Sequence, residues 1–269
     1  MTADAEVAEL NARRAKQYAN EAAIAVDKAR TGLNNAGEVA RQAYELLSRS
    51  RSVAADLSGQ GELMSQAENP GKYAYAVEES STTAGGRVGM SEDMLRDVRR
   101  ELDSTRQQLR TGRRAVEQLS RLPGRRSDLS DGLTDRLDKL EDLVHYADGR
   151  ATEVAGQLAV ARGNVEPMAS QSRSGDLRVT ADTVRSTGTQ AGRNLEDAQD
   201  GLRRLDGDLA VASPELSEAE RESAELDRIV RAASNPTQAS QQRAPGSASE
   251  EGSFNLRPGE ANRQNDYGR

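Results

Sequence analysis

The stretch LDKLEDLVHYADGRATEVAGQLAVARGNVEPM, Leu137 to Met168, carries the apolar repeat that decides the fold. Its apolar residues are separated alternately by three and four positions, and they are Leu137, Leu140, Val144, Ala147, Ala151, Val154, Leu158, Ala161, Val165 and Met168. This alternation averages about 3.5 residues instead of 3.6, and a strict seven-residue repeat keeps one seam facing a partner helix when the helices supercoil left-handedly. The stretch therefore predicts a helix with a coiled-coil seam.

The composition favours long helices over a compact globular core. Of 269 residues, 35% are hydrophobic, 3% aromatic and 30% charged. Aromatic side chains normally supply much of the buried area of a globular core, and here they are scarce. We therefore expect an all-α fold of long heptad-containing helices that form an extended coiled-coil rod with a disordered C-terminal tail.

The same repeat continues outside the opening stretch and defines a set of seam positions. The predicted seam comprises Leu95, Val98, Leu102, Leu109, Val116, Leu119, Leu137, Leu140, Val144, Val154, Leu158, Val165, Leu195, Leu202, Leu205 and Leu209. Because these residues share one phase within each helical tract, we expect them to line the surface on which each helix meets its partner.

Glycine and proline divide the chain into four parts. An Ala-rich helical tract covers 1–58, and a Gly-rich break covers 59–90, with Pro70 and the run SSTTAGGRVG as its signals. Ser91 is a suitable N-cap for the helices of 91–234. We predict interruptions of these helices near 123–126, where LPGRR occurs, near 173–176, and near 213–214, where a Ser-Pro pair either ends or kinks the helix. The polar segment 235–269 is predicted to be a disordered linker or tail.

The sequence contains no set of residues that predicts catalysis, a cofactor or a metal ion. The single histidine, His145, lies beside the seam and has no candidate nucleophile or carboxylate partner, so we interpret it as an exposed helix residue. The glycines of 83–89 lack the lysine and the preceding strand of a phosphate loop. The carboxylates between Glu215 and Glu225 fit a solvated helix face better than a catalytic pair. We therefore predict that the chain is not an enzyme.

Charge and hydropathy limit the partners. The net charge of −7 disfavours nucleic-acid binding, and no apolar run approaches the roughly 18 residues of a membrane span. The first ten residues lack the features of a signal peptide, and no Asn-x-Ser/Thr acceptor is present. A basic cluster surrounds the LPG turn, and it either hydrates the surface or binds an acidic partner or sulfated glycan: Arg110, Arg113, Arg114, Arg121, Arg125 and Arg126.

The order of these tracts resembles the coiled-coil region of a laminin α chain, which is called domain II. The resemblance lies in ANEAAIAVDKA, then LSRLPGRRSDLSDGL, ATEVAGQLAVARGNVEPM and LEDAQDGLRRLDGDLAVASP, and finally ELDRIVRAASN followed by FNLRPG. It covers about residues 10–258, and the glycine-rich segment 81–89 departs from it.

The resemblance implies a structural protein of the extracellular matrix or basement membrane. Such a chain would assemble with laminin β- and γ-like chains and would support receptor binding, cell adhesion and cell migration. The small seam residues, among them Ala147 and Ala151, also favour partners with larger side chains. The alternative is an intracellular, cytoplasmic helical-bundle or coiled-coil adaptor, in which the tracts fold back on one another at 59–90, at LPGRR and near 173–176.

Overall fold

The computed structural model describes residues 3–59, 70–121, 127–173 and 177–234. In this part of the chain there are four helices and no strands, namely α1 (Ala3–Gly59), α3 (Pro70–Ser120), α4 (Ser127–Ser172) and α5 (Leu177–Ser234). The prediction of an all-α fold is therefore confirmed. The predicted tail at 235–269 and the predicted interruption at 123–126 lie outside the described residues, as do residues 174–176 of the interruption predicted at 173–176.

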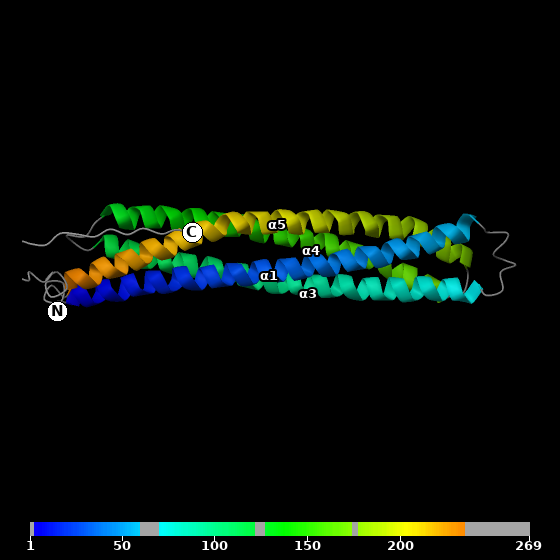
Figure 1. Cartoon of the computed structure of the whole chain (residues 1–269), viewed down its shortest axis with the longest axis horizontal. Coiled ribbons are helices and arrows are strands. Elements are labelled where there is room, and N and C mark those ends of the chain that lie inside the picture. The colour runs from blue at the N-terminus through cyan, green and yellow to red at the C-terminus, as the bar shows by residue number, and fades with distance from the viewer. Residues whose placement is uncertain (1–2, 60–69, 122–126, 174–176, 235–269) are drawn as a thin grey trace, which may run out of the picture. The chain divides into compact units, whose positions relative to one another are not determined.

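The four helices of residues 3–234 pack side by side as a bundle (Figure 1). Helix α1 lies against α3 and α5, and α4 also lies against α3 and α5, so that α1 and α4 occupy opposite corners. Each helix runs antiparallel to the next one along the chain. This is the up-down-up-down arrangement of a four-helix bundle, with helices that are long for such a fold: the 57 residues of α1 extend about 85 Å at 1.5 Å per residue.

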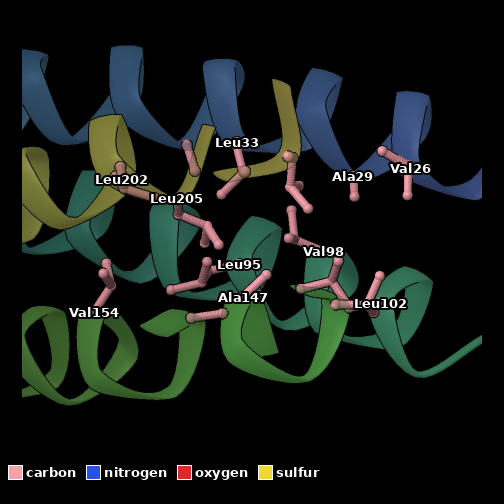
Figure 2. Close-up of a cluster of buried hydrophobic side chains, with 14 of the residues drawn as sticks. Val26, Ala29, Leu33, Leu95, Val98, Leu102, Ala147, Val154, Leu202 and Leu205 are labelled. Atoms are coloured by element: carbon pink, nitrogen blue, oxygen red, sulfur yellow. The ribbon is translucent and has the colours of Figure 1, made fainter. Parts of the chain in front are cut away.

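The seven-residue repeat explains why the helices pack in this way, since it gives each of them one continuous apolar stripe. All sixteen predicted seam residues are buried in the interior of the bundle. Figure 2 shows one cluster in which every helix takes part: Val26, Ala29 and Leu33 of α1, Leu95, Val98 and Leu102 of α3, Ala147 and Val154 of α4, and Leu202 and Leu205 of α5. Each stripe is thus covered by other helices of the same chain.

The prediction of a Gly-rich break at 59–90 is wrong for residues 70–90, because α3 begins at Pro70. Val77, Ala84 and Val88 are fully buried and continue the repeat that leads to Leu95. Each glycine in a helix costs about 1 kcal/mol relative to alanine, but burial of the stripe outweighs that cost. The segment 83–89 is accordingly helical, and only 60–69 of the predicted break lies outside the described residues.

The prediction that Ser91 is an N-cap is wrong, because Ser91 is a buried residue in the middle of α3. Its Oγ donates a hydrogen bond of 2.9 Å to the backbone carbonyl oxygen of Ala36 in α1. Serine is common at helix starts because its hydroxyl satisfies backbone groups, and here the hydroxyl satisfies a group of the neighbouring helix instead.

The predicted interruption near 213–214 is also absent, since α5 continues through Pro214. Pro214 is exposed, and the residues on either side that carry the repeat, Ala212 and Leu216, are both buried. Proline removes the N–H that would bond to the carbonyl oxygen of Ala210. Because Ala210 is exposed too, water can satisfy that carbonyl, and the helix persists.

Candidate interaction groove

Ion pairs join α3 to α4 along most of their length. The pairs are Arg113 with Asp138, Arg110 with Glu141 at 2.5 Å, Arg99 with Asp148 at 3.3 Å, Glu92 with Arg162 at 2.6 Å, and Glu78 with Arg173, just after α4, at 2.7 Å. The arginine lies on α3 in the first three pairs and on the α4 side in the last two. The change of sign along the two helices complements the charges in the observed antiparallel register, and such complementarity favours that register over shifted ones.

Charged and polar contacts also join α5 to both of its neighbours. Arg136 of α4 pairs with Glu222 at 3.0 Å and with Glu215, and the hydrogen bond from its guanidinium to Glu222 raises the pKa of Arg136. On the other side of α5, Arg30 of α1 lies 3.1 Å from Asp206. These contacts show that some carboxylates of 215–225, which the sequence assigned to a solvated face, help to align α4 with α5.

The basic cluster around the LPG turn finds acidic partners within the chain. Arg110 and Arg113 pair with carboxylates of α4, and the hydrogen bond to Asp138 raises the pKa of Arg113. Arg125 and Arg126 lie outside the described residues. Arg110 and Arg113 therefore join α3 to α4, and the prediction that the cluster contacts a separate acidic partner or glycan stays a prediction.

A groove with a volume of about 720 Å³ runs between α4 and α5 on the outside of the bundle. Its α4 wall contains Asp142, His145, Tyr146, Gly149, Arg150, Glu153, Val154 and Gln157, and its α5 wall contains Asp197, Asp200, Gly201 and Arg204. Two glycines shape it. A Cβ on Gly201 would lie 2.5 Å from Val154 Cγ2, so glycine permits the close approach of the helices there, whereas a Cβ on Gly149 would meet open space.

Tyr146 and Arg150 form an ordered pair at the groove. The guanidinium carbon of Arg150 lies 4.7 Å from the centre of the Tyr146 ring, and Arg150 Nη2 donates a 2.6 Å hydrogen bond to Tyr146 Oη. Arg150 Nη1 also lies 3.3 Å from Asp208 Oδ2 of α5. The bond to Tyr146 raises the pKa of Arg150, and a cation–π contact of this kind adds to the order of the pair. Tyr146 nevertheless remains 55% exposed, so its ring is available to a partner.

His145 is exposed, as the sequence predicted, and it lines the groove. In the described ranges, no group of three or more His, Cys, Asp or Glu side chains is placed to hold a metal ion. Also within these ranges, none of the helices combines the length and apolar character needed to cross a membrane.

Sequence reasoning considered His145 but missed the residues that give the groove its character. Tyr146 is one of few aromatic residues in the chain and lies outside the apolar repeat, which is a signal that could have marked it as exposed. The role of Gly201 could not be found in this way, because it depends on the register that places α5 against Val154.

In comparisons with known proteins, no protein-family model, curated protein or solved structure matches the chain.

Proposed function

We propose that the chain is a non-enzymatic adaptor, in which a self-contained helical bundle serves as a rigid scaffold and binds other macromolecules through its outer surface. The observation that carries this proposal is the coverage of the seam. The sixteen seam residues are buried among helices of the same chain, so a coiled-coil partner has no free seam to occupy.

The pattern of side-chain volumes also supports a closed bundle. The seam of α1 consists mainly of alanine, whereas α3, α4 and α5 contribute leucine at many of their seam positions. The sequence predicted that the small residues would need partners with larger side chains. In the bundle those larger side chains come from other helices of the chain, and the interhelical ion pairs hold the helices in matching register.

The laminin-like assembly is the competing proposal, and its support is the strict seven-residue repeat in all four helices. In that arrangement the chain would join β- and γ-like chains in an extended rod, in the extracellular matrix, and would support receptor binding and cell adhesion. It requires the bundle to open, because the same seam cannot face internal helices and foreign chains at once.

Sedimentation equilibrium and circular dichroism on the full chain distinguish the two proposals. The adaptor proposal predicts a monomer of 29.0 kDa that is strongly helical and melts cooperatively, with no change when laminin β and γ coiled-coil fragments are added. A partly helical chain that gains helicity and forms a heterotrimer with those fragments would support the laminin-like assembly and contradict the closed bundle.

A further inference from the structure

The charge of the bundle is distributed unevenly between its two halves. Helix α4 has nine acidic and four basic side chains and α5 has twelve and eight, so this pair carries a net charge of −9 with His145 neutral. Helix α1 has eight of each and α3 has eight acidic and nine basic, so that pair carries +1. The groove lies between the two acidic helices, where the potential attracts cations.

Several carboxylates of the groove form no salt bridge with a described residue. Asp200 pairs with Arg203 at 2.6 Å, and Arg150 is balanced by Asp208. Among the described residues, no salt bridge is formed by the other three carboxylates of the groove or by its remaining arginine, which are Asp142, Glu153, Asp197 and Arg204. Glu153 acts electrostatically on Arg150, but that arginine already pairs with Asp208. The unbalanced charge of the lining is therefore about −2, taking each carboxylate as ionised near neutral pH.

The groove also offers an aromatic surface beside its charged side chains. The exposed ring of Tyr146 stands in the α4 wall, and Gly149 leaves that wall open because it has no side chain, whereas Val154 of the lining is only 2% exposed. Carboxylates line the groove from both helices, with Asp142 and Glu153 on α4 and Asp197 on α5. A concave surface that combines an exposed aromatic ring with carboxylates is suited to a partner that carries apolar and basic side chains together.

We propose that this groove binds a basic amphipathic segment of a partner protein. Apolar side chains of the segment pack against Tyr146 and over Gly149, and its lysine or arginine side chains pair with Asp142, Glu153 and Asp197. The two acidic helices attract such a segment from a distance, and a segment with acidic side chains is repelled. This inference rests on the adaptor function proposed above and names the chemistry of its partner.

Fluorescence anisotropy on the full chain tests the inference with a labelled synthetic amphipathic peptide of leucine and lysine. We expect it to bind at low ionic strength, and a peptide with glutamate in place of lysine to show no binding. The double variant Asp142→Asn with Asp197→Asn should bind the lysine peptide about fivefold more weakly, because it removes two exposed charge pairs. Asp27→Asn with Glu79→Gln removes the same charge from the other half of the bundle and should change the affinity less than twofold.

Each alternative result overturns the inference. Absence of binding of the lysine peptide to the unaltered chain contradicts it, and equal weakening by the two double variants shows a diffuse charge effect and no groove site. Self-association of the chain that the groove variant abolishes would assign the groove to a second copy. Helicity and mass are measured in parallel, so a monomeric helical bundle that does not bind the peptide leaves the adaptor proposal standing. If the groove variant fails to fold, competition by NaCl and by unlabelled peptides on the unaltered chain decides the outcome.

Discussion

Helix α3 is held on its two sides by different means. On the side of α1 the contacts are close and the side chains are small. A Cβ on Gly32 of α1 would lie only 2.8 Å from Val98 Cγ2, and Ser50 Oγ of α1 lies 2.5 Å from Ser80 Oγ of α3. Ser91 adds the hydrogen bond to the carbonyl oxygen of Ala36. In the described residues, no ion pair bridges α1 and α3, so close approach and hydroxyl contacts hold this interface.

On the side of α4 the interface depends on larger side chains and charge. Leucine and valine occupy most seam positions of both helices, and the five ion pairs described above run along the flanks. Small side chains bury less apolar area, at about 25 cal/mol per Å², so the α1 side relies more on how closely the backbones approach. The two interfaces should therefore fail in different ways: the first when a side chain is added, and the second when a large one is lost or charged.

The largest effect is expected from Leu158→Asp in α4. Leu158 is fully buried, so the change removes a core side chain and places a carboxylate where it has no partner. Truncation of a buried leucine alone costs about 2–5 kcal/mol, and the buried charge adds to that. We expect the variant to be largely unfolded at room temperature, as measured by circular dichroism. Ala159→Asp, at the adjacent exposed position, should stay within about 1 kcal/mol of the parent, and equal effects would contradict the buried stripe.

A smaller destabilisation, caused by an added side chain instead of a lost one, is expected on the α1 side from Gly32→Ala. The added methyl group collides with Val98, and overpacking of this kind costs about 1–3 kcal/mol, even though alanine has the higher helix propensity. Gly37→Ala is the matched control, since a Cβ there meets nothing within 4 Å, and it should stabilise the chain by about 0.5–1 kcal/mol. Urea denaturation measures both, and stabilisation by both substitutions would show that α1 and α3 do not pack this closely.

The charges between α3 and α4 should contribute less per pair. We expect Arg110→Ala and Glu141→Ala to cost up to about 1 kcal/mol each, with a coupling free energy of about 0.2–1 kcal/mol in the double-mutant cycle, because Arg110 is 49% exposed. The coupling should decrease at 1 M NaCl, where screening shortens the range of the interaction. Zero coupling at low salt would show that this pair does not align the helices.

The sequence was sufficient to predict the helices and their buried stripe because both follow from local spacing. The stripe from Leu95 to Leu119 and that from Leu137 to Val165 are buried as the repeat requires. The first half of α3 was missed because Ser81 and the glycines at 85 and 86 weaken the apolar signal. In the structure, burial of the apolar stripe stabilises this part of the helix in spite of its low helix propensity.

The groove could not be predicted from local spacing. It depends on which helices become neighbours and in what register, as the contact between Gly201 and Val154 illustrates. The partner of each seam could not be predicted for the same reason, because a seven-residue repeat on its own fits another chain as well as another helix of the same chain. The bulk of the side chains opposite each seam, and the charges beside it, distinguish these cases, and both require the tertiary arrangement.

The smallest expected effects are changes in the pH dependence of stability at two carboxylates, Glu92 and Glu38, whose environments are opposite. Glu92, between α3 and α4, has a side chain that is 12% exposed, and its Oε1 is buried without a hydrogen-bond partner. Burial raises the pKa of Glu92 above its ordinary value of 4.5 although Arg162 acts to lower it. Glu38, on the exposed face of α1, has its pKa lowered from 4.5 to about 2, chiefly by the hydrogen bond from Arg41.

The signs of the two pH dependences follow from proton linkage. A raised pKa means that the folded state binds more protons than the unfolded state, so the free energy of unfolding decreases as the pH rises through and above 4.5. Glu92→Gln mimics the protonated acid, so we expect it to stabilise the chain at pH 7 and to match the parent near pH 3. Glu38→Gln should do the reverse: it lowers stability at pH 7, and the difference disappears as the pH falls from 4.5 towards 2. Thermal melts across this range measure both. Destabilisation by Glu92→Gln at pH 7 would show that the ion pair with Arg162 outweighs burial, and that the charges between α3 and α4 stabilise the bundle as well as aligning it.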